Sequence, residues 1–160
     1  MRNKSERLFP MFVDISDWPI LVVGAGKIAQ RRIETLLQFA LSITVVAPEC
    51  SKKIRQWAQE GKICLKQRAY VPQDLDGMRM VCAATSQNVL NEEIGQECRK
   101  KGILVNVCSD KMQCDFHFPG IVKNDSYVVG INGGGRNHHG VAELRGKVEK
   151  CLEDWEEHEE

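Results

Sequence analysis

The chain lacks the patterns that mark membrane, secreted and nucleic-acid-binding proteins. No apolar run approaches the roughly 20 residues of a membrane span. The charged N-terminus, Met1 to Leu8, has no apolar stretch typical of a secretory signal. Lysine plus arginine and aspartate plus glutamate each total 22, so the formal net charge is zero. Nucleic-acid-binding proteins usually carry a basic excess, so we expect no nucleic-acid partner. Because no long apolar run is present, we expect no membrane association either.

The cysteine pattern does not fit a disulfide framework. The seven cysteines are an odd number and include no C-x-x-C pair, which favours reduced thiols and a cytoplasmic location. Cys64 and Cys82 lie in apolar, strand-like stretches, where we expect them to behave as small buried hydrophobic residues. With 160 residues, 42% of them hydrophobic, the chain is long enough to bury a core.

A glycine motif is the most informative feature that is present. The apolar run Ile20 to Val23 leads into Gly24-x-Gly26-x-x-Ala29, and a helix-like pattern with Lys27 and Ile28 follows at once. In a Rossmann unit the first glycine permits a tight turn, the second lets the backbone approach a pyrophosphate, and the small third residue lets helix and strand pack closely. The motif predicts dinucleotide binding; the alternative is a glycine turn in another α/β domain without a ligand.

Strand-like and helix-like segments alternate along most of the chain. We expect strands at 20–23, 43–46, 63–65, 80–84, 104–107 and 127–131, with helices at 27–39, 51–60 and 88–101 and a last helix from residue 141. Residues 9–14 resemble a short strand or an arm. Helical segments between strands imply a parallel sheet with right-handed crossovers. The predicted fold class is therefore α/β, with a Rossmann-type NAD(P)-binding domain over 1–131 and a glycine-rich loop and C-terminal helix over 132–160.

The periodicity of the first helix places Ile28, Ile33, Leu36 and Phe39 near one apolar face. Ser51 is the expected N-cap of the second helix.

Ligands of parallel sheets bind beyond the carboxyl ends of the strands. Pro48 and Glu49 follow the second strand, and an acidic side chain near this distance from the glycines often contacts the adenosine ribose. The alternative for Glu49 is an acid placed favourably at a helix N-terminus. No arginine adjoins this strand end to bind a 2′-phosphate, although Lys52 and Lys53 are near, so the sequence favours NAD over NADP.

Polar residues follow two later strands. Thr85 could bond to ribose or nicotinamide, or cap the next helix, or do both. In the loop 106–116, Asn106 and Lys111 are candidate substrate contacts, and Asp110 and Asp115 are candidate proton-transfer groups. Aspartates in loops also serve as caps and turn formers. Cys108, Cys114 and His117 match no strong zinc spacing, so no metal is predicted.

A glycine-rich segment precedes the last helix. Gly133 and Gly134 follow a strand and could expose backbone N–H groups as an anion nest. Arg136 and His138 would add donors for carboxylates. The alternative is a surface loop with exposed histidines.

In combination, these motifs resemble those of one family. They are Phe9-Pro-Met-Phe12, Val22-Val-Gly-Ala-Gly-Lys-Ile-Ala29 with Arg31-Arg32, Thr44-Val-Val-Ala-Pro-Glu49, Ala83-Ala-Thr85, Leu104-Val-Asn-Val107 and Cys114-Asp-Phe-x-Phe-Pro119. The sequence is similar to the precorrin-2 dehydrogenase family, the N-terminal module of sirohaem synthases, over about residues 8 to 150. The resemblance implies NAD⁺-dependent oxidation of precorrin-2 to sirohydrochlorin. Some family members also insert Fe²⁺ into the product.

The chain departs from the family in three places. The family usually has an aspartate where this chain has Ser109, and here the aspartate comes one residue later, as Asp110. Gly133 replaces a small hydroxyl residue, and the chain stops after one helix where many relatives add several. These departures leave three interpretations open: a dehydrogenase, a bifunctional dehydrogenase and ferrochelatase, or a non-catalytic NAD- or tetrapyrrole-binding protein. We also expect a homodimer, with the arm 8–13 and the apolar positions Val141, Leu144, Val148 and Leu152 as candidate contacts.

Overall fold

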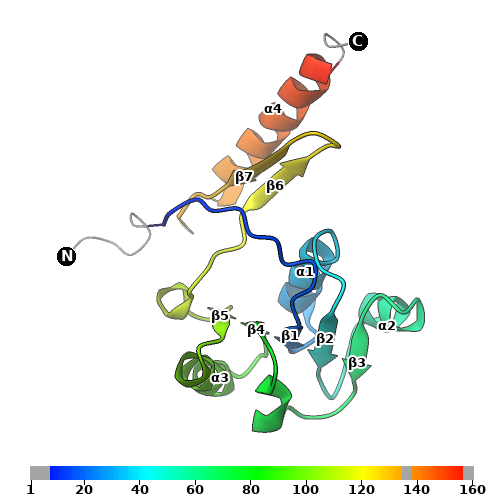
Figure 1. Cartoon of the computed structure of the whole chain (residues 1–160), viewed down its shortest axis with the longest axis vertical. Helices are drawn as coiled ribbons and strands as arrows, with labels where there is room; N and C mark the ends of the chain where they lie inside the picture. The colour runs from blue at the N-terminus through cyan, green and yellow to red at the C-terminus, as the bar shows by residue number, and fades with distance from the viewer. Residues whose placement is uncertain (1–7, 135–137, 157–160) are drawn as a thin grey trace, which may run out of the picture. The chain divides into compact units, whose positions relative to one another are not determined.

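The computed structural model describes residues 8–134 and 138–156, which form two compact units (Figure 1). One unit is Phe12–Phe116, and the other contains His117 and the described residues after it, together with residues 8–11. The division therefore follows Phe116, whereas the sequence predicted a boundary after residue 131.

The larger unit contains a five-stranded parallel sheet. Its order is β3-β2-β1-β4-β5, and every neighbouring pair is parallel, so the predicted α/β fold class is confirmed. The strands are β1 (Ile20–Val23), β2 (Ile43–Val46), β3 (Cys64–Lys66), β4 (Met80–Ala83) and β5 (Leu104–Val107). β1 and β4 are buried along their whole length, as the inner strands of a sheet covered on both faces should be.

Helical segments connect the strands. They are α1 (Lys27–Leu36), α2 (Lys52–Gln59), the 3₁₀ helix η2 (Pro72–Leu75) and α3 (Asn88–Lys101). Right-handed crossovers place α1 and α2 on one face of the sheet and η2 and α3 on the other (Figure 1). Ser51 caps α2 by accepting a hydrogen bond from the Ile54 N–H, as predicted. Gly102 ends α3 in the left-handed conformation, at φ 69°.

Two predictions about individual side chains are wrong. The buried face of α1 consists of Ala29, Ile33 and Leu36, whereas Ile28 is 52% exposed. Ile28 precedes Ala29 by one residue, which turns it about 100° around the helix away from the sheet. Cys82 is fully buried in β4 as expected, but Cys64 is exposed because β3 is an edge strand.

The smaller unit is a hairpin with one helix. Strand β6 (Gly120–Lys123) pairs antiparallel with β7 (Val128–Ile131), and α4 (His138–Glu156) follows. A Cβ on Gly120 would lie 2.9 Å from Cγ1 of Val141, so helix and hairpin approach closely. The prediction that β7 completes the parallel sheet is wrong. The connection between β6 and β7 is a tight turn, and parallel pairing needs a crossover of about a dozen residues.

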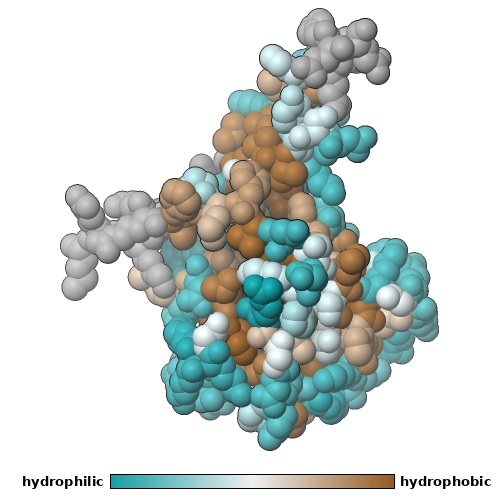
Figure 2. Space-filling model, in the orientation of Figure 1, coloured by the Kyte–Doolittle hydropathy of each residue, from teal (hydrophilic) through white to brown (hydrophobic). Residues whose placement is uncertain are grey.

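The segment before β1 forms an arm. Residues 8–14 have no regular secondary structure, and the side chains of Phe9 and Phe12 are 84% and 75% exposed. Figure 2 shows apolar residues gathered over β6, β7 and α4 as well, where Val128 and Leu144 are exposed. Among the described residues, no helix has the length and apolar composition needed to cross a membrane.

Candidate functional site

The five strands of the parallel sheet end level with one another. In the register of the sheet, the last residues of β3, β2, β1, β4 and β5 are neighbours: Lys66, Val46, Val23, Ala83 and Val107. The loops that follow these strands therefore lie along one edge. β1 is central, and the chain runs outward from it in both directions, so the gap between the β1 and β4 loops is the topological switch point at which such sheets bind ligands.

Gly24 lets the β1 and β4 loops approach each other. Its φ is +105°, a conformation that other residues rarely adopt. A Cβ at this position would lie 2.4 Å from the carbonyl oxygen of Ala84 and 2.9 Å from the amide nitrogen of Thr85. The first glycine of the motif is thus required by the fold, both for its backbone conformation and for its missing side chain.

Gly26 differs, because the fold itself does not require a glycine there. Its φ of −80° and ψ of −170° are open to any residue, and a Cβ would meet nothing within 4 Å. The space beside Gly26 adjoins the start of α1, whose N-cap provides no side-chain hydrogen bond and whose first turn contains no acidic residue. Free N–H groups and the positive end of the helix dipole face this space, which fits a dinucleotide pyrophosphate.

The other motif residues of α1 divide by burial. Ala29 is fully buried, so a small residue lets the helix pack against the sheet, as the motif predicted. Lys27 and Ile28 are exposed in the first turn.

The loop after β2 is tied to α1. The Ser51 hydroxyl donates to Oε1 of Gln30 at 2.8 Å while it caps α2. Pro48 and Glu49 are exposed in this loop, next to the Gly24 turn, where the Gly24 N–H donates to the Val46 carbonyl at 2.9 Å. Glu49 lies outside the first turn of α2, which leaves its carboxylate exposed at the edge where a ribose is expected.

Thr85 makes its contacts within the protein. Its hydroxyl donates to Oδ1 of Asn91 at 2.7 Å and accepts from the Gln87 N–H at 3.1 Å. Gln87 is the N-cap of α3 and the helix start has no side-chain cap, so Thr85 braces the turn before the helix and does not cap it. Asn91 itself was missed by the sequence reasoning. It lies on the buried face of α3 with Ile94 and Cys98, and a polar residue in that apolar stripe was the available signal.

The loop after β5 contains the candidate catalytic residues. Ser109 is exposed, and its Oγ accepts from Nδ2 of Asn91 at 3.4 Å. Asp110 caps the 3₁₀ helix η3 (Lys111–Gln113): its Oδ1 accepts from the Met112 N–H at 2.8 Å, and its Oδ2 from Nε2 of Gln113 at 3.2 Å. Lys111 is exposed.

Two other polar residues of this loop have structural contacts. Oδ2 of Asp115 accepts from the Val105 N–H at 3.0 Å. Asn106 is buried, and its Nδ2 donates to the Phe116 carbonyl at 2.9 Å, while its Oδ1 accepts from the Cys108 thiol at 3.3 Å. Asn106 is part of β5, so its amide ties the loop that follows to the strand. Burial raises the pKa of the Cys108 thiol, which keeps it protonated.

The remaining candidates belong to the smaller unit. Gly133 is exposed, and Gly134 has a φ of 64° and donates from its N–H to Oδ1 of Asn132 at 2.7 Å. Arg136 lies outside the described residues, and of His138 only the backbone, at the start of α4, is described.

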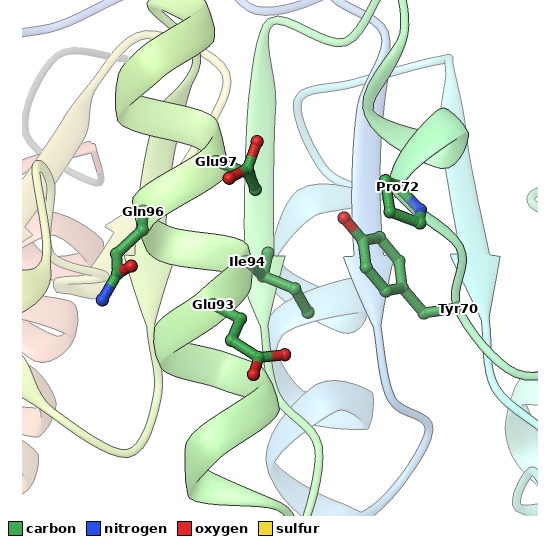
Figure 3. Close-up of a pocket in the computed structure, with 6 residues that line it drawn as sticks. All are labelled: Tyr70, Pro72, Glu93, Ile94, Gln96 and Glu97. Atoms are coloured by element: carbon green, nitrogen blue, oxygen red, sulfur yellow. The ribbon is translucent and has the colours of Figure 1, made fainter.

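A shallow cavity of about 290 Å³ lies on the α3 face of the sheet (Figure 3). Its lining comes from α3 and from the connection before η2: Tyr70, Pro72, Glu93, Ile94, Gln96 and Glu97. No predicted site residue lines it. The Tyr70 hydroxyl is buried and has no hydrogen-bond partner among the described residues, and burial raises the pKa of Tyr70 to about 12.

Known proteins resemble this chain in sequence and in structure. A family described as putative NAD(P)-binding matches residues 11–120. Siroheme synthase 1 of Serratia proteamaculans is 35% identical over 143 residues, covering 89% of this chain and 30% of the relative. The siroheme synthase of Pseudoalteromonas atlantica is 36% identical over 144 residues, covering 90% and 31%. This chain thus spans about a third of the length of these curated relatives.

Among solved structures, SirC, a precorrin-2 dehydrogenase, is 26% identical with a TM-score of 0.80, over 90% of this chain and 70% of that one. The motif-based resemblance to precorrin-2 dehydrogenases and siroheme synthases is therefore confirmed, and the chain belongs to the putative NAD(P)-binding family.

Proposed function

We propose that the chain is an NAD-dependent precorrin-2 dehydrogenase, which oxidises precorrin-2 to sirohydrochlorin. The observation that carries the proposal is the open space beside Gly26, in front of the uncapped start of α1 at the switch point of the sheet. The siroheme synthases and the precorrin-2 dehydrogenase to which the chain is similar support the choice of substrate.

The residues around the glycine turn would hold the cofactor. The backbone of Gly24, Gly26, Lys27 and Ile28, with Ala29 buried behind them, would surround the pyrophosphate, and the α1 dipole would stabilise its charge. Pro48 and Glu49 would adjoin the ribose. The Glu49 carboxylate would accept from a ribose hydroxyl and repel a 2′-phosphate, which favours NAD over NADP. NAD⁺ supplies the hydride acceptor, and the balanced reaction releases NADH and one proton.

Asp110 is the proposed acceptor of that proton. Each of its oxygens accepts one hydrogen bond from its own loop, and a carboxylate has about four lone-pair sites, so capacity for a proton remains. Lys111 is exposed and positively charged, which suits a substrate bearing carboxylates. Asn106 would act by holding this loop. For the smaller unit, Gly133, Gly134, Arg136 and His138 stay proposed carboxylate contacts.

A second candidate is a non-catalytic NAD- or tetrapyrrole-binding protein. It is favoured by Ser109, which replaces the family's aspartate, and by the two hydrogen bonds that engage the Asp110 carboxylate. A bifunctional dehydrogenase and ferrochelatase is disfavoured by the same replacement. Anaerobic incubation with precorrin-2 and NAD⁺ separates these functions, because only a dehydrogenase produces NADH and sirohydrochlorin, and only a ferrochelatase then consumes Fe²⁺.

We also propose that the protein acts as a homodimer. Phe9 and Phe12 in the arm, and Leu144 and Trp155 on α4, are exposed apolar side chains of the kind that interfaces cover. Light scattering measures the molar mass directly. If the wild-type protein is a dimer and becomes a monomer when Phe9 and Phe12 are both replaced by serine, the arm is supported as the interface. A wild-type monomer would refute the proposed dimer.

A further inference from the structure

One buried amide connects two loops of the candidate site. Asn91 is 1% exposed, and its Oδ1 accepts from the Thr85 N–H at 3.0 Å and from the Thr85 hydroxyl at 2.7 Å. Its Nδ2 donates to the Thr85 carbonyl at 3.0 Å and to Oγ of Ser109 at 3.4 Å. Both backbone groups of Thr85 are thus satisfied by a single side chain, which takes the place of a neighbouring strand.

The same segment also contacts the glycine turn. The Ala84–Thr85 peptide occupies the position that a Cβ of Gly24 would need, 2.4 Å from the Ala84 oxygen and 2.9 Å from the Thr85 nitrogen. A continuous series of contacts therefore runs from Gly24 through the Thr85 backbone to Asn91 and on to Ser109. It spans the loops after β1, β4 and β5.

We propose that Asn91 is a positioning residue that fixes these three loops relative to one another, so that cofactor binding and proton transfer depend on its amide. The proposal rests on the proposed dehydrogenase function. Only asparagine supplies an acceptor for the Thr85 N–H together with donors to the Thr85 carbonyl and Ser109, at this length of side chain. A leucine fills a similar volume but leaves the N–H and the carbonyl of Thr85 without their partner and removes the donor to Ser109, so the Thr85 segment shifts to regain partners.

Such a shift has two consequences for the site. The β4 loop moves against the Gly24 turn, which disturbs the pyrophosphate space beside Gly26. Ser109 loses its hydrogen bond to α3, which leaves Asp110 held to that helix only indirectly, through Gln113 and Arg99, and displaces the proposed base. Displacements of about 1 Å cost up to about a hundredfold in rate, so both the affinity for NAD⁺ and the turnover number should fall.

The test compares Asn91→Leu with Ile94→Ala. Ile94 is equally buried on the same helix, so its truncation destabilises the protein without removing a loop hydrogen bond. Both variants are assayed well below their unfolding temperatures, for the NAD⁺ dissociation constant and for kcat and KM. Asn91→Ala is the second variant. It leaves room for water to hydrogen-bond the N–H and carbonyl of Thr85, so we expect it to fold more readily than Asn91→Leu.

We expect Asn91→Leu or Asn91→Ala to raise the dissociation constant about tenfold and to lower kcat about tenfold or more, while Ile94→Ala changes neither by more than about twofold. Unchanged binding and turnover in both Asn91 variants, with only a lowered melting temperature, would overturn the inference. If the wild-type protein binds NAD⁺ without turnover, the dehydrogenase proposal fails, and the dissociation constants alone decide the role of Asn91.

Discussion

Asp74 on η2 and Arg68, which follows β3, form a bidentate ion pair. Nη1 of Arg68 lies 2.7 Å from Oδ2 of Asp74, and its Nη2 lies 2.5 Å from Oδ1. The Asp74 side chain is only 2% exposed, whereas that of Arg68 remains 43% exposed. The Val71 N–H and Nζ of Lys66 also donate to the Asp74 carboxylate. The connection between β3 and η2 is therefore held by one buried charge.

This ion pair predicts a dependence of stability on pH. The Arg68 hydrogen bonds hold the pKa of Asp74 well below its ordinary value. The carboxylate thus stabilises the fold fully above the unfolded pKa of about 3.9, and the contribution is lost as the pH falls below that value. We expect Asp74→Asn to lower the free energy of unfolding by about 2 kcal/mol at neutral pH and by less in acid, as measured by urea titration.

The matched control is Asp76→Asn, which removes an exposed ion pair with Lys101. Exposed pairs contribute about 0–1 kcal/mol, so its effect should be small at either pH. An equal loss of unfolding free energy in the Asp74 and Asp76 variants would show that the buried Asp74–Arg68 pair does not stabilise the protein more than an exposed pair does.

The two glycines of the motif should respond differently to alanine. Gly24→Ala introduces a side chain against the Ala84–Thr85 peptide at a φ of +105°, so we expect a loss on the order of 3 kcal/mol in unfolding free energy. Gly26→Ala places its methyl group in open space at the N-cap of α1, so the unfolding free energy should fall by no more than about 1 kcal/mol. Because that space is proposed for the pyrophosphate, Gly26→Ala should weaken NAD⁺ binding about tenfold, or by about 1.4 kcal/mol. Calorimetry measures the free energy of unfolding and the affinity for NAD⁺. Unchanged NAD⁺ binding in Gly26→Ala would refute the placement of the pyrophosphate beside Gly26.

Removal of the Tyr70 hydroxyl should not destabilise the protein. The group is buried without a partner among the described residues, so Tyr70→Phe removes a desolvated polar atom and should raise the unfolding free energy by up to about 1 kcal/mol. Thermal unfolding measures the change, with Tyr127→Phe as the exposed control. A clear loss of stability in Tyr70→Phe alone would mean that the hydroxyl makes a favourable contact.

Asp110→Asn separates catalysis from binding. An asparagine keeps an acceptor for the Met112 N–H and so preserves the start of η3, but it cannot take a proton. We expect kcat to fall by about a hundredfold or more while the NAD⁺ dissociation constant stays within about twofold. Steady-state kinetics and calorimetry provide the two readouts. Normal turnover would show that the base is another residue.

The sequence predicted those parts of the site that depend on local pattern. The apolar run into Gly24 and the helix after Gly26 are contiguous in the chain, and parallel strands bring the following loops to one edge whatever their separation. Glu49, Thr85 and Asp110 could therefore be placed at that edge from the sequence.

Contacts between distant residues could not be predicted in this way. Asn91 on α3 donates to Ser109 in the loop after β5, and periodicity gives no information on such a pair. The assignment of β7 to the parallel sheet failed because β6 was not recognised as its partner. The same apolar alternation fits a strand of either sheet.

The measurement that tests the central proposal most directly is an anaerobic assay of the purified protein with precorrin-2 and NAD⁺, monitored by NADH absorbance and by the appearance of sirohydrochlorin. The account predicts equal amounts of both products, with turnover lost in Asp110→Asn. Absence of NADH, together with NAD⁺ binding shown by calorimetry, would contradict the dehydrogenase and identify a binding protein.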